Sequence, residues 1–150
     1  MECFKNIEDG IYLETPKIYL TWDTHKDNVI ALSDSFELVN DSYYTLKVKL
    51  SNIPFVDYLG IHFNDDKISK IEMFNKRENV NDIANVFYDN QTILEKSIGK
   101  PIKQSFSSVL FRGEKKKIKH FKWKFKNIEL IHKLWDRFGL EERLEIIIKH

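Results

Sequence analysis

The sequence predicts an α+β fold built on a single antiparallel sheet of about six to eight strands. Several segments alternate apolar and polar residues, the period of a half-buried strand. One mid-chain segment instead repeats its apolar residues at helical spacing. Finally, KWKFKNIELIHKLWDRF, Lys122 to Phe138, repeats the pattern of KVKLSNIPFVDYLGIHF, Lys47 to Phe63, at an offset of 75 residues. We therefore expect two tandem helix-plus-meander halves, about 20–75 and 79–150, with both helices packed on one face of the sheet.

The internal similarity extends beyond those two stretches, to Phe74 and Lys149. Apolar positions match even where identities fail, which indicates the same supersecondary unit in both halves. Identical pairs include Lys47 with Lys122, Asn52 with Asn127, Leu59 with Leu134 and Phe63 with Phe138.

Composition indicates one globular domain, residues 1–150, with 42% hydrophobic and 31% charged residues. A net charge of +1 gives no general case for a nucleic-acid or membrane partner. The single cysteine, Cys3, excludes an internal disulfide and suits a reducing compartment. The sequence shows no signal peptide and no run of 18 apolar residues, so we expect a cytoplasmic protein.

In the first half, Pro16 interrupts a strand-like segment, which predicts an edge strand or an irregular extension. Thr24 followed by Asp27 is a helix-start signal, and we expect a short helix at about His25 to Ser35. A three-stranded meander follows, with strands at Tyr43 to Leu50, Phe55 to Phe63 and Ile68 to Phe74.

In the second half, the clearest helix starts near Asn79 or Asn81 and stops at Gly99. Strands at Ser105 to Phe111 and Lys117 to Lys126 then form a hairpin, and Leu144 to Ile148 closes the sheet. Asn127 to Phe138 fits either an amphipathic helix or a strand, and its match to a Pro-containing segment in the first half favours the strand.

Strand alternation leaves one face of this sheet uncovered by helices. Aromatic and arginine side chains on such a face would serve as anchors for a partner, and lysines would form a charged rim that attracts an acidic surface. The same pattern also suits a solubilising surface, a Trp135 buried in the core, or a homodimer interface. The candidate partner-binding residues are Tyr58, His62, Trp135, Arg137, Lys47, Lys49, Lys122, Lys124 and Lys133.

The arrangement resembles the tandem helix-plus-sheet repeats of the β-lactamase-inhibitor-protein type, on the strength of the repeat from Lys47 and Lys122 onward and the helix between them. Its organisation is also similar to small bacterial immunity proteins. These resemblances are architectural and rest on no shared motif. They imply a protein that neutralises a toxin or an enzyme by covering it, without a cofactor or a catalytic residue.

The sequence gives little indication of a metal, cofactor or catalytic site. The five histidines form no metal-ligand spacing, and no glycine-rich phosphate loop or nucleophile elbow occurs, so we expect no metal site and no cofactor. The acidic pairs Asp65–Asp66 and Glu141–Glu142 fall in expected turns. Two alternatives stay open: a small enzyme or ligand-binding protein with a pocket at His132 and Asp136 between helices and sheet, and an RNA-binding sheet that uses Lys122 and Lys124. Alternation puts lysines and aromatics on opposite faces of that last strand, which argues against nucleic acid.

Overall fold

The protein folds around one eight-stranded antiparallel sheet, with a separate two-stranded sheet and two helices. The computed structural model describes residues 2–75, 83–111, 114–136 and 140–150. The sheet order is β3-β4-β5-β6-β10-β9-β8-β7. Its strands are β3 (Glu37–Asn40), β4 (Tyr43–Lys47), β5 (Tyr58–Asn64), β6 (Lys67–Phe74), β7 (Lys103–Phe111), β8 (Glu114–Lys124), β9 (Ile128–Asp136) and β10 (Leu140–Ile148).

The sheet consists of two consecutive four-stranded meanders that meet where β6 pairs with β10. At this seam Ile71 lies opposite Ile146, and Met73 lies opposite Leu144. All four side chains are fully or almost fully buried. The predicted antiparallel sheet and its strand number are therefore confirmed.

The segment 128–136 is a strand, β9, which pairs with β8 on one side and β10 on the other. Its buried side chains recur at every second residue, at Ile128, Leu130, His132 and Leu134. This is the period of a strand, and it decides between the two alternatives that the sequence leaves open. The prediction that Glu141 and Glu142 lie in a turn is wrong, since both are in β10. Opposite Glu141 and Glu142 lie Trp135 and Leu134 of β9.

The N-terminal segment forms its own two-stranded sheet from β1 (Gly10–Leu13) and β2 (Ile18–Thr21) rather than an edge of the large sheet. It is attached by a bridge between Thr15 and Lys49, where the Lys49 amide donates to the Thr15 carbonyl at 2.9 Å. Its buried side chains belong to the same hydrophobic core as those on the inner face of the large sheet. They are Cys3, Phe4, Ile7, Ile11, Leu13, Ile18, Leu20 and Trp22.

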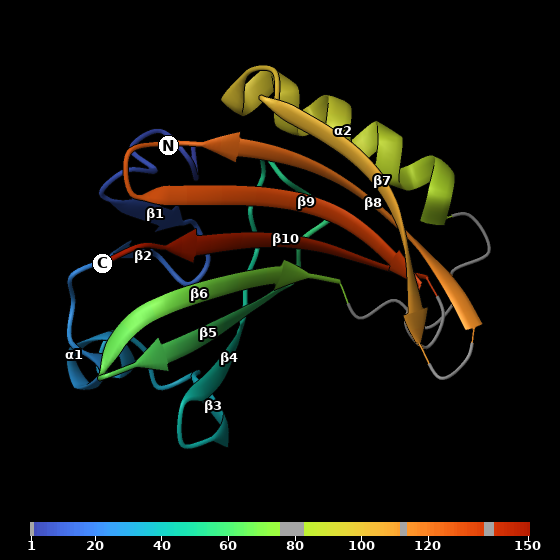
Figure 1. Cartoon of the computed structure of the whole chain (residues 1–150). Helices are drawn as coiled ribbons and strands as arrows, with labels where there is room; N and C mark the ends of the chain where they lie inside the picture. The colour runs from blue at the N-terminus through green and yellow to red at the C-terminus, as the bar shows by residue number, and fades with distance from the viewer. Residues whose placement is uncertain (1, 76–82, 112–113, 137–139) are drawn as a thin grey trace.

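The two helices differ in length. α2 (Ile83–Ile98) contacts β9 and β10, and it ends at Gly99, which takes the left-handed conformation predicted for a helix stop, with φ of 96°. α1 (Lys26–Ile30) is much shorter than expected, and the Lys26 amide bonds to Asp66 in the β5–β6 turn. In Figure 1, α2 lies beside the β7–β8 end of the sheet, and β1 and β2 lie toward the end where both termini are marked.

The predicted duplication is not established by the structure. The two halves have the same number of strands in the large sheet, but their strand-pairing registers differ. Leu46 lies opposite Leu59 in the first meander. At the offset positions, Phe121 lies opposite His132 instead of Leu134, a shift of two residues that keeps every side chain on its face. Among the described residues, the long helix α2 belongs to the second half, and the first half has only the short α1.

Candidate functional site

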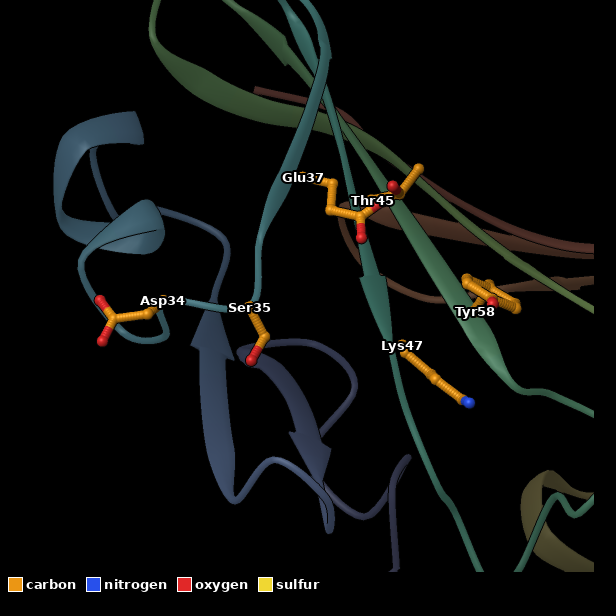
Figure 2. A pocket seen from close by; sticks show the side chains of 6 residues that line it. All are labelled: Asp34, Ser35, Glu37, Thr45, Lys47 and Tyr58. Atoms are coloured by element: carbon orange, nitrogen blue, oxygen red, sulfur yellow. The ribbon is translucent and has the colours of Figure 1, made fainter.

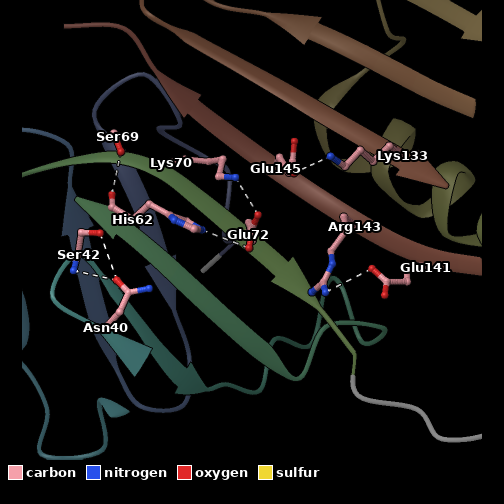
Figure 3. A network of polar contacts seen from close by, with 10 residues as sticks. All are labelled: Asn40, Ser42, His62, Ser69, Lys70, Glu72, Lys133, Glu141, Arg143 and Glu145. Carbon is pink, nitrogen blue, oxygen red and sulfur yellow. Dashed lines mark hydrogen bonds and ion pairs between the residues drawn. The ribbon is translucent and has the colours of Figure 1, made fainter. Parts of the chain in front are cut away.

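The candidate site is the face of the large sheet that points away from the core, called the open face here. Its side chains alternate with the buried ones along each strand. Figure 3 views the sheet from this side, with α2 and the β1–β2 hairpin lying behind the strands. The open face carries Glu37, Tyr43, Thr45, Lys47, Tyr58, Gly60, His62, Lys70, Glu72, Phe74, His120, Lys122, Lys124, Glu129, Ile131, Lys133, Trp135, Glu141, Arg143, Glu145 and Ile147.

A row of aromatic and arginine side chains crosses the open face where β5 begins and β6 ends; we call it the anchor row. Tyr58 and Phe74 are opposite one another on β5 and β6, and their rings stack with centroids 5.8 Å apart. The guanidinium carbon of Arg143, on β10, lies 4.2 Å from the Phe74 ring centroid. Stacking of this kind holds an arginine side chain in place while leaving its edge able to donate hydrogen bonds.

Trp135 lies beyond this row, on β9. The Lys133 ammonium lies 4.9 Å from the Trp135 ring centroid and 2.7 Å from a carboxylate oxygen of Glu145. β6 and β10 separate Trp135 from Tyr58, so the two are about 14 Å or more apart by strand spacing. The predicted anchors therefore share a face without touching, and Phe74 with Arg143 fills the distance between them.

A second cluster surrounds Glu72 on β6. His62 Nε2 lies 3.2 Å from one Glu72 oxygen, and the Lys70 ammonium lies 2.8 Å from the other (Figure 3). Hydrogen bonding to His62, followed by the bond to Lys70 and the charges of both, lowers the pKa of Glu72 to about 2 against the opposing effect of burial. Glu72 is therefore a fixed negative charge at the centre of the face.

Tyr43 covers this cluster from β4. Its ring stacks on His62 with centroids 4.2 Å apart. It also lies across Gly60, where an added Cβ would meet the Tyr43 hydroxyl oxygen at 2.5 Å. Burial and the nearby charge of Glu72 raise the pKa of Tyr43, so it stays a neutral hydroxyl. The absence of a side chain at Gly60 makes this close packing feasible.

Lysines concentrate toward β7 and β8. Lys103 lies opposite Lys122, whose ammonium is 3.2 Å from Glu129, and Lys124 is exposed. Burial lowers the pKa of His120, and the charges of Lys103, Lys122 and Lys133 lower it further. The three lysines therefore place positive charge around His120, although burial is the larger cause of its lowered pKa.

Lys47 lies at the other end, in a hollow of about 380 Å³. Figure 2 shows its walls, which come from the segment before β3 and from β3, β4 and β5. The wall residues are Asp34, Ser35, Glu37, Thr45, Lys47 and Tyr58. Because Tyr58 belongs to both, the hollow is continuous with the anchor row.

Of the nine residues predicted for partner binding, seven are on the open face, namely Lys47, Tyr58, His62, Lys122, Lys124, Lys133 and Trp135. Lys49 lies past the end of β4, on the bridge to Thr15. Arg137 lies outside the described residues. Prediction missed Phe74 and Arg143, although the same alternation would have placed both on this face.

The other predicted pocket, at His132, is a buried polar cluster on the inner face. His132 is fully buried beneath α2, where its ring stacks on Phe87 at 4.2 Å between centroids. Its partner on the sheet is Glu142, with Nε2 and Oε1 2.7 Å apart. The side chain of Asp136 lies outside the described set. Sequence alone missed Glu142, because its register against β9 decides which face it takes.

Two features bear on other classes of site. Among the described residues, no three His, Cys, Asp or Glu side chains gather as a metal ion would require. Within the same ranges, neither helix has the length and apolar character of a membrane span.

Comparisons of the chain with protein-family models, curated proteins and solved structures found no match. The open face and the buried cluster must therefore be interpreted from their own chemistry.

Proposed function

We propose that this chain is a protein-binding module of the immunity or inhibitor class, which acts in the cytoplasm by covering an acidic surface of a toxin or enzyme with its open face. The observation that carries the proposal is the anchor row of Tyr58, Phe74 and Arg143, with Trp135 beside it. Tyrosine, tryptophan and arginine are enriched among the few residues that contribute most of the binding energy at protein interfaces.

Charge supports an acidic partner. The central carboxylates Glu72, Glu129 and Glu145 are each paired with a lysine of the same face. Lys47 and Lys124 are exposed and form no ion pair with another described residue. An approaching acidic surface would therefore meet positive charge beside Tyr58, at Lys47, and again at Lys124, which lies opposite Glu129 at the other end of β9 from Trp135. Such charge accelerates association, and its effect weakens with salt.

The partner-binding role can be tested by affinity capture, with purified variants as bait for proteins from the native organism. Tyr58→Ala and Arg143→Glu alter the anchor row, and Lys124→Glu alters the charged rim. Lys17→Glu is the matched charge-reversal control, because Lys17 is exposed on the N-terminal hairpin, behind the sheet. Any protein retained is then purified, and its association rate, dissociation rate and Kd are measured by surface plasmon resonance.

We expect Tyr58→Ala and Arg143→Glu each to weaken binding at least tenfold, roughly the effect of an interface hot spot. Lys124→Glu should slow association, and Lys17→Glu should change neither rate. A partner that binds all four variants equally would refute the open face as its docking surface. Nucleic acid as the only retained material would refute the class.

A further inference from the structure

A continuous chain of hydrogen bonds connects α2 to the sheet through His132. Gln91 donates from Nε2 to Glu95 at 2.9 Å, and its Oε1 lies 2.7 Å from His132 Nδ1. On the other side of the ring, Nε2 lies 2.7 Å from Glu142 Oε1. Asn90 secures that carboxylate, donating from Nδ2 to both oxygens at 2.9 Å.

Within the described residues, Asn90 is a further hydrogen-bond donor to this chain of groups, and it serves Glu142. Gln91 is 4% exposed and His132 is 0% exposed. The aromatic rings of Phe87 and Phe55 pack against the imidazole. Among described residues, the charged groups that face the cluster are Glu95 from α2, Glu142 from β10 and Lys119 from β8. The Lys119 ammonium donates to the Tyr88 hydroxyl at 3.0 Å.

Counting hydrogens shows that the chain is one proton short if its groups carry their ordinary charges. Three contacts each need one hydrogen: Glu95 with Gln91, Gln91 with His132, and His132 with Glu142. An amide presents N–H on one side and oxygen on the other, and a neutral imidazole has one N–H and one bare nitrogen. Two hydrogens are thus available for three contacts when both carboxyls are ionised.

The shortage does not depend on how the amide or the ring is oriented. Turning the Gln91 amide would supply the hydrogen to His132 but place two oxygens together at Glu95. Exchanging the imidazole tautomer only changes which ring contact lacks a hydrogen, the one with Gln91 or the one with Glu142. Only an added proton, on the imidazole or on either carboxyl group, completes all three bonds.

We propose that the chain from Glu95 to Glu142 is a proton-binding site that fastens α2 to the sheet, so that the folded protein holds one proton more than the unfolded chain near neutral pH. The proton belongs to the whole chain of groups. Burial lowers the pKa of His132, and the hydrogen bond and charge of Glu142 oppose that effect.

Above about pH 6.5 the unfolded chain has a neutral histidine and two ionised carboxyls. The folded state then binds one proton more, and stability falls as pH rises. The unfolding equilibrium constant should increase by roughly tenfold per pH unit until the proton leaves the chain.

Urea unfolding between about pH 6.5 and 8 tests this with two matched carboxylate-to-amide changes. In Glu95→Gln the new amide, on the half-buried surface of α2, supplies the missing hydrogen. The slope of unfolding free energy against pH should then lose the contribution of one proton. Glu141→Gln, next to Glu142 but on the open face, should keep the wild-type slope. Equal slopes for wild type and Glu95→Gln would overturn the proposal.

Nitrogen-15 NMR of the His132 ring provides a second readout in the unaltered protein. Proton loss from the chain should shift both ring nitrogens with a single midpoint, and Glu95→Gln should abolish that step. Ring nitrogens that show no step between about pH 5 and 9 would contradict a titrating site.

Discussion

Glu72 shows how strongly a single side chain can depend on its neighbours on the open face. Its folded-state pKa of about 2 lies below the unfolded value, so it contributes stability above about pH 4.3 that is lost as pH falls toward 2. Glu72→Gln should cost on the order of 2 kcal/mol at pH 7 and much less at pH 2.5. Chemical unfolding at both pH values measures the difference. An equal cost at both would show that the carboxylate charge contributes nothing.

Cys3 offers a second test at a single residue. Burial, with a smaller effect from the charge of Glu14, raises the pKa of its thiol to about 12. Thiolate is the reactive form, so the native protein should react with thiol reagents far more slowly than the unfolded chain, by about a hundredfold or more at pH 8. Labelling followed by mass spectrometry measures both rates. Rapid labelling of the native protein would show that the N-terminal segment opens independently.

The sequence predicted which side chains lie on the open face better than it predicted which of them are in contact. Alternation placed Tyr58, Lys133 and Trp135 on one side of the sheet correctly. It could not show that Phe74 and Arg143 lie between them, because that depends on which strands are neighbours. Pairing of distant strands is set by long-range packing, which a local pattern does not contain.

At the scale of elements, α2 was predictable because its apolar stripe and its glycine stop are both local signals. α1 was overestimated, since Ser33 and Ser35 provide local hydrogen bonds that compete with a helix. The N-terminal hairpin was not foreseen as a separate sheet, because the Pro16 signal is compatible with any non-central strand.

The end of α2 provides a test of that local signal. Gly99 has φ of 96°, and its carbonyl accepts the Trp123 indole N–H at 2.7 Å. Gly99→Ala would force a side chain into the left-handed region and should cost about 1 kcal/mol. Thermal unfolding measures it, with Lys100→Ala as the exposed control. No loss of stability in Gly99→Ala would mean that the helix end relaxes elsewhere.

For the whole molecule, the seam between β6 and β10 makes the two meanders one folding unit. Ile71 and Ile146 are opposite one another there and fully buried. Ile146→Ala should destabilise the protein by about 2 to 5 kcal/mol and lower the midpoint of a single cooperative transition. Circular dichroism and tryptophan fluorescence should report the same midpoint. Separate midpoints would show that the halves unfold independently.

The central position of β10 also has a consequence for synthesis. Of the strands in the described part of the chain, β10 is the last to leave the ribosome, yet it joins β6 to β9. Until it emerges, a nascent chain carries two incomplete sheets whose unpaired edges can bind other chains. A chain whose β10 is still missing from the sheet would therefore be prone to aggregation, and it would benefit from a chaperone until β10 has paired.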